Sequence, residues 1–323
     1  MRFDMRAPAQ GAPAQELYRA ALEMAEWGER HGCAAVQVSE HHGSPDGYLP
    51  APLVLASAIA ARTRRLPIQV AALILPLHDP IELAEQMAVL DLVSAGRVSY
   101  VLAAGYRAEE YAMFGRDLRE RGRRMDAGLA ALRRAFSGEP FEFEGRPVRV
   151  LPRPATPGGP PLLLGGASAA AVRRAARFGL GMLTQGCDDS LEALYRAECA
   201  RHGTRPGPFL NPPAGTVTSA FVADDPDAAW RELGPYLLHD ARMYAAWLDE
   251  GAAVSRSGAR SVEELRAAGG PYRIFSPEEA VAHVRARGVL LLQPLCGGLP
   301  PALAWRHLEL VEKHVLPALR KPA

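Results

Sequence analysis

Eight short apolar runs, each followed by a segment with helical periodicity, constrain what this chain of 323 residues can fold into. The segments after the runs repeat their apolar residues every three or four positions, as a helix with one buried face does. Regular alternation of strands and helices predicts a parallel sheet that helices cover on both faces. The predicted strands are residues 1–5, 34–39, 68–75, 97–103, 162–164, 181–184, 216–222 and 289–292.

The number of runs distinguishes between two α/β architectures. A (β/α)8 barrel needs about 250 residues, which leaves roughly 70 residues of this chain for insertions. An open doubly wound sheet is the alternative, but no GxGxxG motif follows the first run and no change of composition divides the chain. We therefore predict a single (β/α)8 (TIM) barrel domain over residues 1–323, with a hairpin near 141–151 and a lid near 251–272.

Composition and charge exclude several classes of protein. The chain has 37 basic and 36 acidic residues, so its net charge of +1 gives no electrostatic reason to expect nucleic acid or an anionic membrane as a partner. No apolar run is long enough to span a bilayer, and the first ten residues lack the apolar core of a signal peptide. We expect a cytoplasmic protein without disulfides or a structural metal, because no CxxC spacing occurs among Cys33, Cys187, Cys199 and Cys296.

The stretch VSEHHGSPDGYLP at residues 38–50 contains the strongest candidates for catalysis. Glu40, His41 and His42 stand where the second run ends, and turn-forming residues follow them. In a barrel the active site lies at the carboxyl ends of the strands, so we predict that His41 and His42 are catalytic. Because neighbouring strand residues point to opposite sides, only one imidazole is expected to face the lumen. A structural role and a metal site are the alternatives, although adjacent histidines chelate one metal poorly.

A second group of residues is suited to binding a phosphate. The sequence GGAS at 165–168 leads directly from the fifth run into a helix, where free N–H groups and the helix dipole favour an anion. The same residues also fit a tight turn with Ser168 as the N-cap. The run RGRR at 121–124 offers a cationic partner, although such a run is also typical of a solvated helix start. Tyr48 and Tyr106 are candidates for the walls of a pocket for a flat ring.

Four stretches together resemble the bacterial-luciferase-like family of flavin- and deazaflavin-dependent oxidoreductases. They are VSEHHGSPDGYLPAPLVLASAIAART, AALILPLHDPIELAEQMAVLDLVSAGRV, GYRAEEYAMFG and LLLGGASAAAVRRAARFG, and their order and spacing extend the resemblance over nearly the whole sequence. The resemblance implies a barrel that binds FMN or F420, with His41 as the active-site histidine. It also implies a homodimer through the helices after strands two and three.

The resemblance also assigns cofactor contacts. It places at Ala71 and Ala72 a bulge of strand three, often with a non-prolyl cis peptide bond, that supports the flavin ring. The phosphate would bind at 165–168 with one arginine of 121–124. The predicted cofactor-binding residues are Ala71, Ala72, Gly105, Tyr106, Arg123, Gly165, Gly166, Ala167 and Ser168.

Three functions follow from the resemblance. The first is a two-component monooxygenase that uses reduced FMN from a separate flavin reductase, together with O2, on a small organic substrate; His41 is then a general acid or base. The second is an F420-dependent oxidoreductase that transfers hydride without O2. The third is a flavin-binding barrel without catalysis, because Ala104 and Ala167 replace polar residues that are common in the family.

Overall fold

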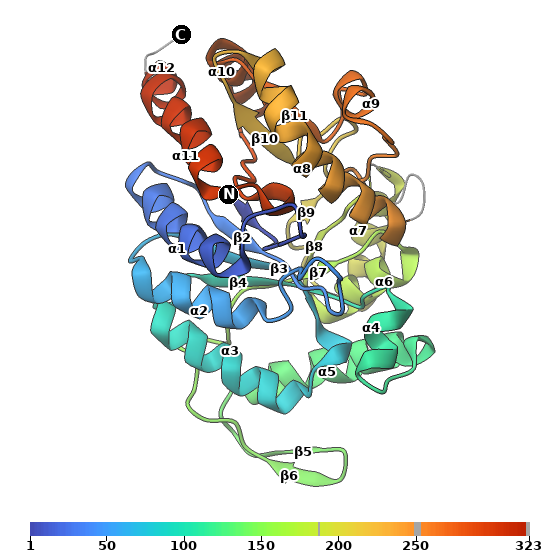
Figure 1. Cartoon of the computed structure of the whole chain (residues 1–323). Coiled ribbons are helices and arrows are strands. Elements are labelled where there is room, and N and C mark those ends of the chain that lie inside the picture. The colour runs from blue at the N-terminus through green and yellow to red at the C-terminus, as the bar shows by residue number, and fades with distance from the viewer. Residues whose placement is uncertain (187, 249–252, 321–323) are drawn as a thin grey trace. The chain divides into compact units, whose positions relative to one another are not determined.

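The computed structural model describes residues 1–186, 188–248 and 253–320 and shows an α/β fold (Figure 1). Two units can be distinguished in it. The first unit consists of Met1–Val36, Ser44–Leu49 and Pro212–Ala323, and the second of Gln37–Gly43 and Pro50–Asn211. Cys187, and the predicted lid's first residue Gly251, lie outside the described residues.

The strands of the second unit form a sheet in the order β2-β3-β4-β7-β8-β9. The pairs β3–β4, β4–β7, β7–β8 and β8–β9 are parallel, so their carboxyl ends lie at the same edge of the sheet. Val70, Leu73, Tyr100 and Leu102 are completely buried, as expected for strands covered on both faces. The strands are β2 (Val36–Val38), β3 (Ile68–Ile74), β4 (Val98–Ala103), β7 (Leu162–Gly165), β8 (Gly181–Leu183) and β9 (Phe209–Leu210).

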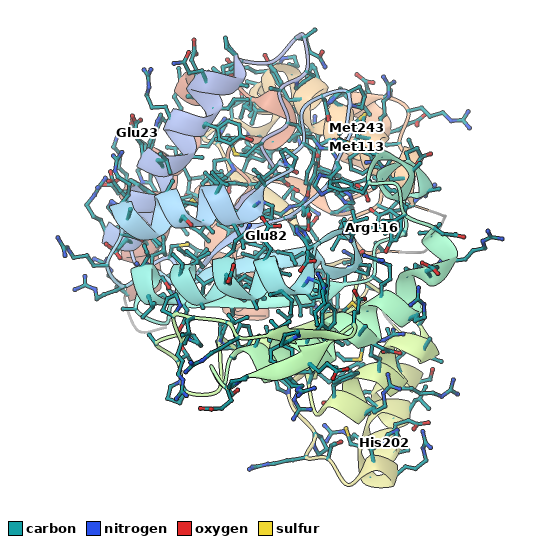
Figure 2. All side chains as sticks on the ribbon, turned by 90° about the horizontal axis from the view of Figure 1, so that it is seen from below. Glu23, Glu82, Met113, Arg116, His202 and Met243 are labelled. Atoms are coloured by element: carbon teal, nitrogen blue, oxygen red, sulfur yellow. The ribbon has the colours of Figure 1, made fainter. Side chains whose placement is uncertain are left out.

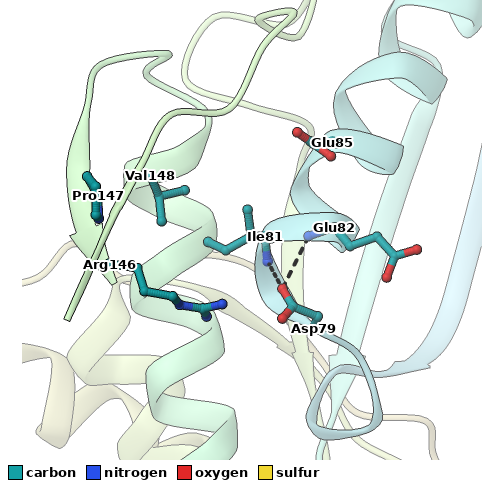
Figure 3. A pocket seen from close by; sticks show the side chains of 7 residues that line it. All are labelled: Asp79, Ile81, Glu82, Glu85, Arg146, Pro147 and Val148. Atoms are coloured by element: carbon teal, nitrogen blue, oxygen red, sulfur yellow. Dashed lines mark hydrogen bonds between the residues drawn. The ribbon is translucent and has the colours of Figure 1, made fainter. Parts of the chain in front are cut away.

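The helices of the second unit follow the strands, and α2 packs along α3 (Figure 1). Asp79 is the N-cap of α3: its Oδ1 accepts hydrogen bonds from the N–H groups of Ile81 at 2.8 Å and Glu82 at 3.3 Å (Figure 3). The sequence Asp79-Pro80-Ile81-Glu82 predicts a capping box; the Asp79 cap is confirmed, but the Glu82 carboxylate accepts from Gln86 instead of from the backbone N–H of Asp79. The helices are α2 (Pro52–Arg62), η1 (Leu75–Leu77), α3 (Pro80–Ser94), α4 (Ala108–Met113), η2 (Leu118–Glu120), α5 (Arg121–Ala135), α6 (Ala169–Phe178) and α7 (Ser190–His202).

The predicted hairpin between residues 141 and 151 is confirmed. Strands β5 (Phe141–Phe143) and β6 (Arg146–Val148) pair in antiparallel fashion and project from the second unit (Figure 1). A pocket of about 350 Å³ lies between β6 and the start of α3 (Figure 3). Its lining is Asp79, Ile81, Glu82, Glu85, Arg146, Pro147 and Val148.

In the first unit, β10 (Ser219–Val222) and β11 (Tyr272–Phe275) form a parallel pair. Within the described ranges, no helix combines the length and the apolar character needed to cross a membrane. The other elements are β1 (Arg2–Phe3), α1 (Ala14–Arg30), α8 (Pro226–Trp247), α9 (Val262–Ala267), α10 (Pro277–Arg287), η3 (Cys296–Gly298), α11 (Pro301–Leu310), the π-helix η4 (Val311–Val315) and α12 (Leu316–Arg320).

Arg6 is the centre of a buried charged network in the first unit. Its guanidinium group donates from Nε to Asp240 and from Nη1 to Asp46, both at 2.7 Å. The rings of Tyr48 and Trp247 lie 4.7 and 4.6 Å from the guanidinium carbon, within the range of a cation–π contact. Tyr48, predicted as a possible wall for a flat ring, therefore packs on an arginine of its own unit.

Three predicted segments differ in the structure. Residues 289–292 contribute one bridge, from Leu292 to Ala220, and Val289 is 45% exposed, so this apolar run is not a buried strand. The segment predicted as a lid contains α9 and reaches β11 at its end. The charged sequence of residues 107–124 predicts an irregular loop, but this segment contains α4, which is too short to show a helical period.

Candidate active site

Glu40 lies at the end of β2 and binds four groups of the second unit, three through its carboxylate and one through its backbone N–H. Its Oε1 accepts hydrogen bonds from Nε2 of His42 at 2.7 Å and Nε2 of His78 at 2.8 Å. Its Oε2 accepts from the Ile74 N–H at 2.5 Å, and its own N–H donates to the Ala72 carbonyl at 3.2 Å. Burial raises the pKa of Glu40, but the hydrogen bonds outweigh this effect and lower the pKa to about 2. Glu40 is therefore ionised at neutral pH.

A second buried carboxylate, Glu110 of α4, holds the other imidazole. Its Oε1 accepts from Nδ1 of His41 at 2.8 Å, from the His42 N–H at 3.0 Å and from Nη1 of Arg107 at 3.1 Å. Burial opposes ionisation of Glu110, but the His41 hydrogen bond and the Arg107 charge lower its pKa. The other oxygen, Oε2, is buried and has no hydrogen-bond partner among the residues that the structure describes.

The two carboxylates define which tautomer each histidine adopts when its ring is uncharged. An ionised carboxylate can only accept a hydrogen bond, so Nδ1 of His41 and Nε2 of His42 must carry the protons. The lone pairs are consequently on Nε2 of His41 and Nδ1 of His42. The Tyr106 hydroxyl lies 3.3 Å from Nε2 of His41, and the two rings meet edge to face at 5.6 Å. The arrangement suits proton transfer at Nε2 of His41, with Glu110 stabilising the imidazolium.

The bulge of β3 is present at the predicted position. The Ala71–Ala72 peptide bond is cis, and the register between β3 and β4 shifts between Ala71 and Leu73. Nε2 of Gln37 donates to the Ala71 carbonyl at 3.2 Å, and the Ala72 carbonyl is bound by Glu40. The bulge itself is confirmed, whereas its support of a flavin ring remains a prediction.

The turn from β7 into α6 has donors for an anionic group. Oγ of Ser168 accepts from the Ala171 N–H at 3.2 Å, which confirms the predicted N-cap. The N–H groups of Ala169 and Ala170 have no acceptor within the described part of the chain, and they lie at the positive end of the α6 dipole. Ala167 and Ser168 are exposed, so a phosphate can reach this end of the helix. These residues fit the phosphate of a flavin nucleotide.

The arginines after α4 differ in their suitability for that phosphate. The predicted residue Arg123 is 71% exposed and forms an ion pair with Glu120 at 2.8 Å. Arg124 and Arg116 instead both donate to the Pro76 carbonyl, Arg124 through Nε at 3.1 Å. Burial and the neighbouring charge of Arg124 lower the pKa of Arg116, so an anion bound there would relieve repulsion. Figure 2 locates Arg116 on the segment that leads into α5.

Sequence reasoning missed Glu110, His78 and Arg107 as site residues. Glu110 and Arg107 belong to GYRAEEYAMFG and His78 belongs to LHDP, so motifs marked all three without assigning them roles. Gly105, by contrast, was predicted, and it has a positive φ of 71°. A Cβ at Gly105 would lie 2.7 Å from Cγ2 of Ile74, so packing against β3 excludes a side chain there. Within the described ranges, no three His, Cys, Asp or Glu side chains are placed to hold a metal ion.

The fold and these contacts define a class of α/β protein with paired carboxylate–histidine groups at the carboxyl ends of parallel strands. The profile of the family described as "Luciferase-like monooxygenase" matches residues 1–285. The chain therefore belongs to the luciferase-like monooxygenase family, which confirms the resemblance noted in the sequence.

Individual relatives agree with this assignment. The alkanal monooxygenase alpha chain of Photorhabdus luminescens is 27% identical over 52% of this chain and 48% of its own length. The 4-hydroxyprotoasukamycin monooxygenase of Streptomyces nodosus subsp. asukaensis is 30% identical over 54% of this chain and 48% of its own length. The chain thus spans about half the length of the curated relatives that it matches.

Solved structures extend the similarity to the whole chain. Monooxygenase RslO1 from Streptomyces bottropensis is 25% identical, covers 98% of both chains and has a TM-score of 0.76. The oxygenating constituent of 3,6-diketocamphane monooxygenase from Pseudomonas putida, solved in complex with FMN, is 18% identical, covers 99% of this chain and 100% of its own, and has a TM-score of 0.67. At that identity the second likeness concerns the fold alone.

Replacing Glu40 by glutamine should lower the free energy of unfolding by an amount that depends on pH. In the folded state the pKa of Glu40 falls from 4.5 to about 2, so its contribution is fully present above pH 4.5 and is lost as the pH falls toward 2. The full contribution is on the order of 3 kcal/mol. Urea unfolding at pH 7 and pH 3 measures the difference between wild type and Glu40→Gln. An equal loss of unfolding free energy at both pH values would contradict the lowered pKa of Glu40. Glu85→Gln, at an exposed position of α3, is the control.

Proposed function

We propose that this protein is the oxygenating component of a two-component monooxygenase, which uses reduced FMN and O2 to oxygenate a small organic substrate. The observation that carries the proposal is a chain of hydrogen bonds from Glu110 through His41 to Tyr106. His42 connects Glu110 to Glu40, and Glu40 binds the Ala72 carbonyl of the cis bulge. Membership of the luciferase-like monooxygenase family supports it. When bound, reduced FMN would supply the electrons for O2 activation, with one oxygen atom entering the substrate and the other leaving as water.

The residues of the chain have distinct roles in this proposal. His41 would take up or release a proton at Nε2, and Glu110 would hold its ring in one orientation. Ala71, Ala72, Gly105 and Tyr106 would line the flavin ring, where small side chains leave room for a flat group. The phosphate would bind at residues 165–168, with Arg124 rather than Arg123 as its cationic partner.

The wider setting is part of the same proposal. We propose that the chain forms one (β/α)8 barrel domain and that the protein works in the cytoplasm. A separate flavin reductase would deliver reduced FMN. F420-dependent hydride transfer is the alternative function on the same fold.

Oxygenation should depend on His41 and Glu110. With reduced FMN supplied by an NADH-dependent flavin reductase, we expect His41→Ala to lower kcat by about 100-fold or more, which is typical of removing a general acid or base. Glu110→Gln should lower kcat less and change its pH profile, because the ring would lose its fixed tautomer. Product formation under air from a panel of organic substrates is the measurement. His202→Ala, an exposed histidine on α7 (Figure 2), is the control, and unchanged turnover in His41→Ala would refute the role.

Arg124→Ala should weaken the binding of FMN about tenfold, because a charge-assisted hydrogen bond to phosphate contributes roughly 1.5 kcal/mol or more. Riboflavin, which has the same ring without the phosphate, should bind wild type and Arg124→Ala equally. Titrations followed by flavin fluorescence give both dissociation constants, with Arg123→Ala as the matched control. Equal FMN affinities for wild type and Arg124→Ala would contradict the phosphate site. Tight F420 binding without FMN binding would favour the alternative function.

The outer surfaces of α2 and α3 support the predicted homodimer. Val54 of α2 is 71% exposed, and on the adjacent α3 Val93 is 54%, Val89 47% and Leu92 45% exposed, so apolar side chains reach the solvent on both helices. Exposed apolar residues gathered on neighbouring elements mark interaction surfaces. We propose that a second copy of the chain covers α2 and α3.

Leu92→Glu should convert the proposed dimer into a monomer, because it places a charge within the apolar contact. Size-exclusion chromatography with light scattering at about 10 µM protein measures the mass. Leu151→Glu changes another exposed leucine, 49% exposed, and should leave the mass unchanged. A monomeric wild type, or a dimeric Leu92→Glu, would count against this interface.

A further inference from the structure

We propose that the substrate is an uncharged, largely apolar molecule with a hydroxyl group, and that this hydroxyl donates a hydrogen bond to Nδ1 of His42. The inference rests on the proposed function, because it takes the paired carboxylate–histidine groups as an active site. It assigns His42 a role that differs from that of His41: binding and orienting the substrate.

The first argument is the state of His42. Its Nε2–H donates to Glu40, so the lone pair of the neutral ring is on Nδ1. Within the described chain, Nδ1 of His42 makes no hydrogen bond, and the side chain is only 8% exposed. Nδ1 of His42 is not one of the buried side-chain atoms that lack a partner, so it is open to solvent and a ligand with an O–H or N–H donor can reach it.

The second argument is the apolar surface that surrounds the histidines. The Phe114 ring meets the His42 ring edge to face at 4.7 Å. Sδ of Met113 lies 3.6 Å from the position that a Cβ on Gly43 would take, and Tyr106 contacts His41. Met113 is 66% exposed, Tyr106 41% and Phe114 40%, so three large side chains beside residues 41–43 face solvent. Such exposed apolar groups mark a binding site.

The size and charge of this surface define its occupant. Three side chains are far fewer than the 20–30 residues that each partner contributes to a stable protein interface, so the surface fits a small molecule. The ionised Glu40 carboxylate holds the His42 ring and, among the residues that the structure describes, has no arginine or lysine as a partner, so it would repel an anionic substrate. Glu110 is paired with Arg107 at 3.1 Å, and the two charges cancel. The substrate is therefore uncharged.

Three bicyclic probes test the proposal: 2-naphthol, naphthalene and 2-naphthoate, which share one apolar body. We expect 2-naphthol to bind wild type about 3- to 10-fold more tightly than naphthalene, the advantage of one hydrogen bond. 2-Naphthoate, which is anionic at pH 7, should bind most weakly. Quenching of tryptophan fluorescence gives the dissociation constants, and tighter binding of 2-naphthoate than of 2-naphthol, or no binding of any probe, would overturn the proposal.

Variants of the chain test the hydrogen bond to Nδ1 of His42 and the apolar surface beside it separately. His42→Phe should abolish the advantage of 2-naphthol over naphthalene, and Phe114→Ala and Met113→Ala should weaken both probes about 3- to 10-fold. Leu151→Ala, which shortens an exposed leucine in the connector after the hairpin, is the control and should bind like wild type. Circular dichroism and the melting temperature establish that each variant is folded. An advantage of 2-naphthol that survives in His42→Phe would overturn the assignment of Nδ1.

These measurements need neither FMN nor turnover, so failure of this proposal and of the proposed function can be distinguished. If the probes bind in the expected order while FMN does not bind, the proposed function fails and the assignment of the acceptor stands. If FMN binds and supports oxygenation while the probes bind in another order, the substrate class is wrong.

Discussion

The Glu40 carboxylate is the interaction on which the candidate site depends. A carboxylate removed from water loses several kcal/mol of solvation unless donors replace the water. Glu40 finds three donors, in the His42 and His78 rings and the Ile74 N–H, and these donors come from the ends of β2 and β3 and from the loop after β3. One buried charge therefore links the ends of both strands and orients the His42 imidazole.

Hydrogen-bond donors or opposite charges stabilise a buried charge at two further places in the chain. Glu110 collects donors from His41, His42 and Arg107, and so secures α4 beside the end of β2. In the first unit Arg6 is the buried charge, compensated by Asp46 and Asp240. Burial and the neighbouring Asp240 charge there raise the pKa of Asp4 to about 6. Both units thus combine an apolar core with buried charges that opposite charges or hydrogen-bond donors stabilise, although Arg6 Nη2 and Glu110 Oε2 have no hydrogen-bond partner among the described residues.

Much of the fold could be predicted because apolar patterns report burial. The runs that became β3 and β4 are buried on both faces, and the cap at Asp79 and the turn at Ser168 carry local signals. Strand β9 has two residues, and β11 ends a segment without a period, so neither had enough residues to show alternation. The prediction of a buried strand at residues 289–292 was wrong for the opposite reason: the residues are apolar, but Val289 and Leu291 face solvent.

By itself the sequence determined the α/β class, the family and the position of the histidine pair, because periodicity and motif order are properties of neighbouring residues. Only the tertiary structure decided which groups complete the site. Glu110 is 69 residues from His41 and His78 is 38 from Glu40, and no local pattern connects positions so far apart. The tautomer of His41 follows from the distant Glu110 carboxylate, because a proton's position on a ring depends on what the ring contacts.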